Sequence, residues 1–194
     1  MKNNFFALIS RMRYIGRWGL MRNSSPENIQ EHSHMVAVIA HALAVIRRDV
    51  FGGSIDPNLV AAAALYHDAS EIFTGDLPSP IKYLNRDILA AYKQVEDVAM
   101  DKLLRLLPGQ LQASYVPLLT EVDEDVRQLI KSADRLSAYI KCLEELRAGN
   151  DEFQAAKREI LRSIEANALP ETGYFMAHCI PAFTLTLDEL DLSV

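Results

Sequence analysis

The segment DPNLVAAAALYHDASEIFTGDLPSP, residues 56–80, contains the features that decide the fold. Asp56 and Pro57 form a helix-start pair, because aspartate accepts hydrogen bonds from free amides at a helix N-terminus and proline fits the first turn. The alanine-rich apolar run after them predicts a helix that extends to about Phe73. The next residues, TGDLPSP, include one glycine and two prolines, so a helix cannot continue and an irregular loop must follow.

Helical spacing of apolar residues continues through almost all of the chain and predicts an all-α protein. The other expected helices cover residues 4–15, 25–48 with Ser25 as N-cap and Pro26 in the first turn, 86–107, 108–119, 123–148, 152–166 and 171–179. Strict alternation of apolar and polar residues is convincing only in FTLTL, residues 183–187. No period of 20 to 50 residues repeats, which favours a compact bundle over a solenoid.

The length of 194 residues is typical of one domain. We therefore expect a single domain over residues 1–194, with a metal-binding core at about 25–145 and C-terminal helices at 150–180 that pack on it. A net charge of −6 has the wrong sign for a protein that wraps nucleic acid, so no polymer partner of that kind is expected.

The apolar stretch of residues 35–46 is too short to cross a bilayer, which needs about 20 residues, and no membrane association is expected. Cys142 and Cys179 lie in apolar helical patterns, which is typical of reduced thiols rather than a disulfide framework. The N-terminus has no features of a signal peptide. Together these features predict a cytoplasmic location.

The helical phase of the histidines separates one of them from its neighbours. At about 100° per residue, His32 shares the buried stripe of its helix with Val36 and Ile39. His34 and His41 point to the opposite side. A single histidine on an apolar face is most often a hydrogen-bonded core residue, so His32 alone does not indicate a site.

Three ionisable residues, His67, Asp68 and Glu71, end the alanine-rich helix, and Asp134 lies within the apolar pattern of the long helix. Burying such groups unpaired is costly. Two imidazoles and two carboxylates from three helices form a mixed nitrogen and oxygen ligand set that holds a divalent ion and leaves positions open for water or substrate. The pattern favours one metal ion over two.

The order H…HD…D, formed by His32, His67-Asp68 and Asp134, resembles the ligand pattern of the HD-domain metal-dependent phosphohydrolases. The surrounding strings are similar to the bacterial 5′-deoxynucleotidase branch, the YfbR-type enzymes: RYIGRWGLMRN (13–23), ENIQEHS (27–33), LYHDASEIFTGDLPSPIK (65–82) and KSADRLSAYIKCLEEL (131–146). The resemblance extends from near residue 5 to the FTLTLDEL tail.

The resemblance implies an all-helical HD fold with one divalent ion, cobalt, manganese or another transition metal, bound by His32, His67, Asp68 and Asp134. The activity that it implies is removal of phosphate from deoxyribonucleoside 5′-monophosphates by a cytoplasmic homodimer. By motif, the remaining site residues are Glu71 for the attacking water, Arg17 for the phosphate, Trp18 for the sugar, Asp76, Leu77, Pro78 and Ser79 in a substrate loop, and the ligands Asp68 and Asp134 as further substrate contacts. Ser79 stands where the family pattern has threonine, and it keeps the hydroxyl.

The chemistry of these residue types agrees with the resemblance. Arg17 offers a planar fork for bidentate phosphate binding, and Trp18 can exclude a 2′-hydroxyl. Each also has an ordinary structural interpretation: a solvated charge for Arg17, a core anchor for Trp18 and a turn residue for Asp76.

Two alternative functions stay open at the level of sequence. One is an HD phosphohydrolase or phosphodiesterase that acts on another nucleotide, such as a cyclic nucleotide or guanosine tetraphosphate. The other is a helical interaction module without catalysis, which the retention of Arg17, Glu71 and the ligand set disfavours.

Overall fold

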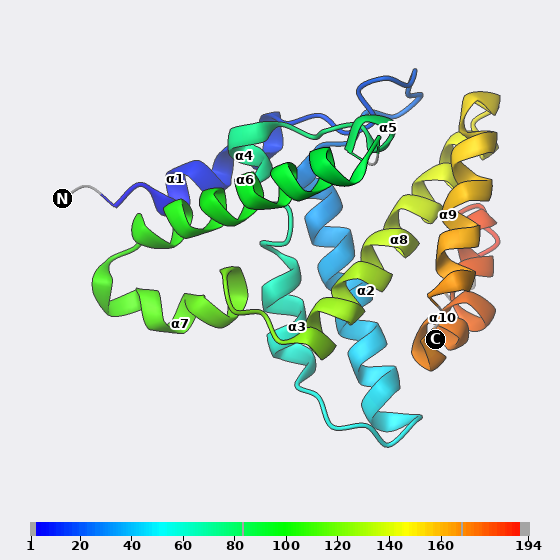
Figure 1. Ribbon diagram of the computed structural model, residues 1–194. Coiled ribbons are helices and arrows are strands. Elements are labelled where there is room, and N and C mark those ends of the chain that lie inside the picture. Colours follow the sequence, from blue (N-terminus) through cyan, green and yellow to red (C-terminus); the bar gives the residue numbers. More distant parts are fainter. Residues whose placement is uncertain (1–2, 83, 168, 191–194) are drawn as a thin grey trace.

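The computed structural model describes residues 3–190 except 83 and 168, and not the side chain of Ser79. Its α-helices are α1 (Phe5–Ile9), α2 (Ile29–Asp49), α3 (Pro57–Ala64), α4 (Glu71–Thr74), α5 (Ser79–Lys82), α6 (Arg86–Arg105), α7 (Gly109–Leu119), α8 (Glu124–Arg147), α9 (Gln154–Ala166) and α10 (Pro170–His178) (Figure 1). Short 3-10 helices cover Ser10–Tyr14, Asp151–Phe153 and Ile180–Thr184. Within the described residues no strand forms, and the all-α prediction is confirmed.

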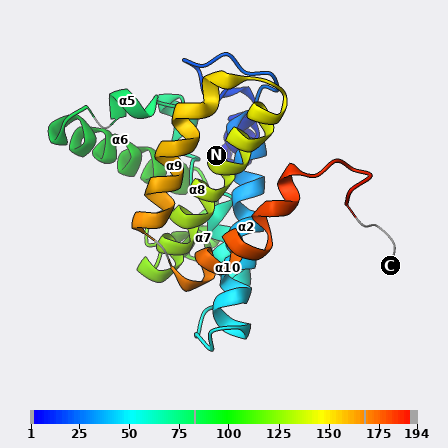
Figure 2. The ribbon, with the colours of Figure 1, turned by 90° about the vertical axis from the view of Figure 1, so that its right-hand side faces the viewer.

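Helices α2 and α8 cross at the centre of the molecule, and α3 packs beside α2 (Figure 1). Figure 2 shows α9 lying across α8, with α10 beside α2. The main core consists of buried apolar side chains from α2, α3 and α8, closed by others from the C-terminal elements. A smaller cluster joins α1, α6 and α7 around Phe5 and Leu103.

Helix α2 is the one helix among the described residues with the length and mean hydropathy of a membrane span. It is also the central core helix, since 56% of its most apolar window is buried inside the protein. Its apolar character is therefore explained by packing against α3 and α8.

The predicted start of the second helix at Ser25 and Pro26 is wrong, because α2 begins at Ile29. Asn28 is the N-cap, and it forms a capping box with Glu31. The residues before it do not form a helix, since Ser24 and Ser25 lie in a bend, the Ser25 amide donates to Glu145 at 3.0 Å, and Gly16 and Asn28 form an antiparallel bridge. These tertiary contacts override the local helix-start signal.

The predicted continuous helix from Pro57 to Phe73 is also wrong. Helix α3 ends at Ala64, residues 65–70 form tight turns, and α4 begins at Glu71. The turns replace i→i−4 hydrogen bonds with i→i−3 bonds, such as His67 N–H to the Ala64 carbonyl at 3.3 Å. This distortion directs two consecutive side chains, His67 and Asp68, into the same site.

Two smaller differences concern the ends of the chain. The first predicted helix is a short α1 followed by a 3-10 helix, Ser10–Tyr14. The alternating FTLTL segment forms no strand, because Phe183 and Thr184 belong to a 3-10 helix and no described segment of the chain pairs with it. The other predicted helices agree with α6 to α10 within a few residues.

Candidate active site

Three parts of the chain bring the predicted metal ligands together: the first turn of α2, the turns after α3, and the middle of α8. His32 Nε2 lies 3.0 Å from Asp134 Oδ1 and 3.5 Å from Asp68 Oδ2. His67 Nε2 lies 3.1 Å from the same Asp68 oxygen. The donor atoms of His32, His67 and Asp68 all lie within 4.8 Å of one another, so these three residues surround one point, with Asp134 reaching it beside His32.

The second ring nitrogen of each histidine is engaged on the side away from this point. His32 Nδ1 lies 3.2 Å from the Ser137 hydroxyl, and His67 Nδ1 lies 2.8 Å from the Ala64 carbonyl oxygen, to which it donates. Both Nε2 atoms are buried and have no hydrogen-bond partner. Metal-binding histidines typically have this arrangement, because the outer hydrogen bond fixes the tautomer and leaves a lone pair for the ion. The donor set therefore fits a divalent cation.

The charges of the cluster hold it in a form ready for a cation. Burial raises the pKa of Asp68, but the positive charges of His67, His32 and Arg17 outweigh this effect and hold that pKa well below its ordinary range. Burial lowers the pKa of His67, but the carboxylates of Asp68 and Asp134 raise it overall to about 9. The raised pKa of His67 means that a metal ion at this nitrogen would compete with a proton.

Glu71 lies at the start of α4 and is buried. Burial, followed by repulsion from Asp68 and Asp76, raises its pKa to about 9, although Arg17 and Lys82 act in the opposite direction. Its Oε2 atom is buried without a hydrogen-bond partner. A buried carboxyl with a displaced pKa beside a metal site is a candidate general base or acid.

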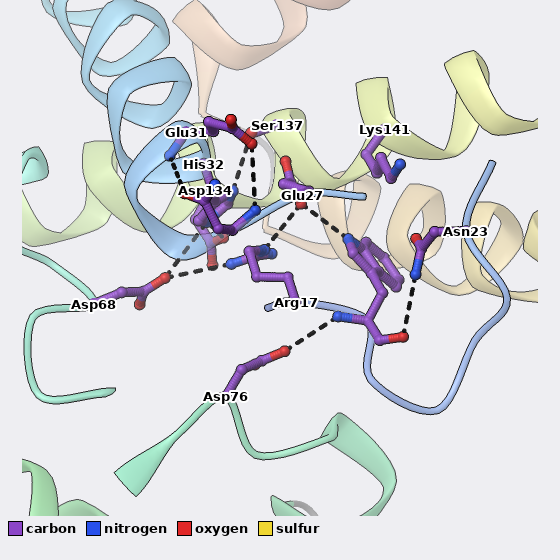
Figure 3. Close-up of polar contacts among 12 residues, drawn as sticks. Arg17, Asn23, Glu27, Glu31, His32, Asp68, Asp76, Asp134, Ser137 and Lys141 are labelled. Atoms are coloured by element: carbon purple, nitrogen blue, oxygen red, sulfur yellow. Dashed lines mark hydrogen bonds and ion pairs between the residues drawn. The ribbon is translucent and has the colours of Figure 1, made fainter. Parts of the chain in front are cut away.

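Arg17 lies between the metal cluster and a carboxylate from the segment before α2 (Figure 3). Its Nη1 is 3.4 Å from Asp68 Oδ2, and its Nε donates to Glu27 Oε2 at 3.0 Å. Burial lowers the pKa of Arg17, but the carboxylates around it raise it overall, so the guanidinium stays charged. A fixed cation next to the metal ligands is suited to binding a phosphate.

Trp18 has a backbone φ of +60°, and it is the one described residue other than glycine with a positive φ. Such a conformation is strained for a bulky residue and must be held by its surroundings. The Trp18 amide donates to Asp76 Oδ2 at 3.2 Å, the indole Nε1 donates to Glu27 Oε2 at 3.0 Å, and the ring packs against Phe153. These contacts fix the indole in place.

A cleft of about 990 Å³ opens beside these residues and extends between α6, α8 and α9. The predicted site residues that line it are Arg17, Trp18, His67, Asp68, Asp76, Pro78 and Asp134. His32, Glu71 and Leu77 do not line it, and the side chain of Ser79 lies outside the described part of the chain. Gly75, with a φ of +71°, makes the sharp turn that carries Asp76 toward Trp18.

Histidines outside the predicted ligand set also lie outside the cluster. His34 and His41 are exposed on the far side of α2, as their helical phase predicts. His178 is exposed and stacks on Tyr174, with ring centroids 4.3 Å apart.

Sequence reasoning gave no role to Glu27, Ser137 or Glu145. Glu27 accepts from both Arg17 and Trp18, and Ser137 contacts His32 from one turn beyond Asp134. Glu145, buried and paired with Lys141, accepts from the amides of residues 24 and 25 and so ties the Arg17 loop to α8. The helical phase of Ser137 relative to Asp134 was an available signal, but nothing in the sequence pairs residue 27 with residue 17.

Solved structures with a similar fold include two that are described as HD phosphohydrolases. An HD-domain phosphohydrolase from Listeria innocua has a TM-score of 0.79 at 24% identity, with 93% of this chain and 88% of that chain covered. The HD phosphohydrolase DatZ of cyanophage S-2L, bound to dA and one catalytic Zn²⁺ ion, has a TM-score of 0.62 at 19% identity, covering 90% and 95%. These likenesses show that the protein has the fold of the HD-domain proteins, and its His32, His67 and Asp68 cluster could hold a metal ion.

Sequence relatives define its family more narrowly. The family model described as 5′-deoxynucleotidase YfbR-like matches residues 4–183. A 5′-deoxynucleotidase of Cronobacter sakazakii is 48% identical over 191 residues, which are 97% of this chain and 96% of that protein. Another, of Yersinia pestis, is 49% identical over 192 residues, 98% of each. The chain belongs to the YfbR-like 5′-deoxynucleotidase family, and the resemblance noted in the sequence is confirmed.

Proposed function

We propose that this protein hydrolyses deoxyribonucleoside 5′-monophosphates to deoxyribonucleosides and phosphate. One observation carries the proposal: Arg17 Nη1 lies 3.4 Å from Asp68 Oδ2, so a phosphate-binding cation adjoins a cluster of metal ligands within one cleft. The names of the relatives and the deoxyadenosine bound to the phage HD protein support the same substrate class.

His32, His67, Asp68 and Asp134 would hold one divalent ion, of cobalt, manganese or another transition metal. When bound, the ion supplies Lewis acidity that lowers the pKa of water and polarises a phosphoryl oxygen. Zinc in the phage relative supports a transition metal of this kind. Asp68 and Asp134, which line the cleft, would also border the substrate.

Glu71 would accept a proton from the attacking water at its buried, unpartnered Oε2. Since burial and the nearby carboxylates raise its pKa, a positive charge must come close before Glu71 ionises. The charge of Arg17 already acts in that direction. A cation bound nearby would lower the pKa of Glu71 and so make its carboxylate a better base.

Arg17 would neutralise and orient the phosphate, because its Nε is already used by Glu27 and its Nη atoms face the metal cluster. Trp18 would pack against the sugar where a 2′-hydroxyl would otherwise lie, and Asp76 would accept from the 3′-hydroxyl. Leu77, Pro78 and Ser79 would complete the loop around the substrate. A dry pocket with a steric wall can discriminate strongly against one added hydroxyl group.

We further propose that the protein works as one HD domain over its whole length, in the cytoplasm, without a nucleic-acid polymer or a membrane as partner, and as a homodimer. Exposed apolar side chains on α6, Val95 and Val98 among them, support an interface between two copies. Size-exclusion chromatography with light scattering tests the oligomeric state.

The function is tested with metal-stripped protein, with and without added manganese or cobalt. Phosphate release is measured from the deoxy 5′-monophosphates of the five common bases, the matching ribonucleotides and the 3′-monophosphates. We expect metal-dependent release from the deoxy 5′-monophosphates alone, and none from a Glu71→Ala variant. Release from a cyclic nucleotide or guanosine tetraphosphate instead, or from no substrate while metal stays bound, would contradict the proposal.

A further inference from the structure

We propose that Glu27 is a positioning residue that sets Arg17 and Trp18 together and thereby controls the preference for deoxyribose. This inference rests on the proposed deoxynucleotidase function. In the described part of the chain, the Glu27 carboxylate makes no hydrogen bond or ion pair with the metal cluster or the substrate loop, and it acts through Arg17 and Trp18, which it holds.

The backbone places Glu27 opposite Arg17. The Arg17 amide donates to the Glu27 carbonyl at 2.9 Å, and the Ile29 amide donates to the Ile15 carbonyl at 3.0 Å, on either side of the bridge between Gly16 and Asn28. Two short extended segments are thus paired directly before α2 begins. The pairing explains why the predicted helix start at Ser25 fails, since Asn28 is extended and bridged to Gly16 instead of lying inside a helix.

One oxygen of Glu27 then serves two donors. Oε2 accepts from Arg17 Nε at 3.0 Å and from Trp18 Nε1 at 3.0 Å, in a region where the side chains of Arg17 and Glu27 are only 13% and 17% exposed. Because the Nε edge of the guanidinium is occupied, its Nη1 is directed toward Asp68. Because the indole N–H is bound to Glu27, the ring is held against Phe153 in one orientation at the cleft that Trp18 lines.

Because the backbone of Trp18 is strained, the hydrogen bond from its indole to Glu27 is important for holding the residue in place. A φ of +60° must be held by surrounding contacts, and the hydrogen bond from the Trp18 amide to Asp76 restrains only the backbone. Glu27 supplies the restraint on the side chain. Arg17, which would bind the phosphate, and Trp18, which would pack against the sugar, are therefore held by the same carboxylate. Glu27 fixes the spacing between them although it takes no part in the reaction.

The test compares the wild type with Glu27→Ala and Glu27→Gln, and with Glu31→Gln as matched control. Glutamine at residue 27 keeps a carbonyl acceptor for the indole and the guanidinium, and glutamine at residue 31 keeps the capping box. Two readouts are used: kcat and KM for dAMP and AMP, and acrylamide quenching of the fluorescence of Trp18, the single tryptophan of the chain.

For Glu27→Ala we expect a loss of about 10- to 100-fold in kcat/KM for dAMP, a dAMP-to-AMP preference reduced at least about fivefold, and a more easily quenched Trp18. Glu27→Gln should recover most of the preference, and Glu31→Gln should match the wild type. If Glu27 had only a structural role, its loss would lower kcat/KM equally for dAMP and AMP and leave the ratio of the two values unchanged.

The proposal is overturned if folded Glu27→Ala, checked by circular dichroism, keeps the wild-type substrate ratio or the wild-type quenching. If the wild type releases no phosphate from either nucleotide, the proposed function fails, and the quenching alone then decides whether Glu27 positions Trp18. Unchanged quenching would end the proposal, and increased quenching would retain the positioning role.

Discussion

The α2–α8 core and the site beside it differ in backbone geometry and in the kind of side chain that they bury. In the core, regular helices satisfy their own backbone, and the buried side chains are apolar, such as Leu43 and Leu136. In the site, the backbone forms tight turns at residues 65–70 and has a positive φ at Trp18, and the buried side chains are ionisable, such as His32 and Glu71. The His32 and His67 Nε2 atoms remain without hydrogen bonds there. A buried polar group is costly unless it has a partner, so this contrast indicates that a ligand is the missing partner.

The sharpest way to break the contrast is to remove a metal ligand. We expect Asp68→Ala to lower phosphate release by at least about 1,000-fold, since ligand, charge and the contact to Arg17 are lost together. The fold should survive, because Asp68 lies in a turn outside the core. Metal content after dialysis and circular dichroism check the two halves of this prediction. Retained metal and activity would remove Asp68 from the site.

The opposite result is expected in the core. Leu136→Ala should lower the free energy of unfolding by about 2–5 kcal/mol, because the side chain is fully buried between α2 and α8. The kcat of the protein that remains folded should change little. Urea unfolding and kinetics at low temperature measure the two effects. A large loss of kcat without loss of stability would show that core and site are not separable in this way.

Glu71→Gln sharpens the comparison through pH. The pKa of Glu71 is raised to about 9 by burial and by neighbouring carboxylates, so the folded protein holds this proton more tightly than the unfolded chain does. Its stabilising contribution is present below about pH 4.5 and is lost as the pH rises toward 9. In metal-free protein, Glu71→Gln should therefore become more stable relative to wild type as the pH rises from 5 to 8, by up to about 1.4 kcal/mol per pH unit.

Thermal melts of both metal-free proteins across that range measure this gain. The pKa of His67 is also raised, to about 9, so His67 titrates within part of the same pH range. Because it titrates in both proteins, its effect on stability largely cancels in the difference between them. A stability difference that is constant with pH would contradict the displaced pKa of Glu71.

The smallest effect is expected at Ser137. Its hydroxyl lies 3.2 Å from His32 Nδ1 and fixes the ring from behind. Ser137→Ala should weaken metal affinity about 10-fold, with little change in stability, since outer partners of ligating histidines contribute on this scale. Isothermal titration with manganese checks the value. An unchanged affinity would mean that packing alone orients His32.

Much of this molecule could be predicted from its sequence, because amphipathic periodicity reports directly on helices. The phase of His32 against His34 and His41 correctly separated a buried imidazole from two exposed ones. The order of His32, His67-Asp68 and Asp134, together with the strings around these residues, predicted the family that the family model confirms.

The features that escaped prediction are those in which tertiary contacts override local signals. Ser25-Pro26 has the local chemistry of a helix start, but the bridge between Asn28 and Gly16 and the hydrogen bonds to Glu145 keep that segment out of helical conformation. The end of α3 at Ala64 has no glycine or proline to mark it, and the turns follow from the packing of His67 and Asp68 around a common point. The link between Glu27 and Arg17 likewise depends on two segments meeting in space.

The central claim is that one divalent ion in the His32, His67, Asp68 and Asp134 cluster makes this chain a deoxynucleotidase. The most direct test adds manganese to metal-stripped protein in small steps, while bound metal and dAMP hydrolysis are followed in the same sample. We predict that activity rises in proportion to bound metal and saturates at one ion per chain. Hydrolysis before any metal is bound, or full metal binding without hydrolysis, would contradict the claim.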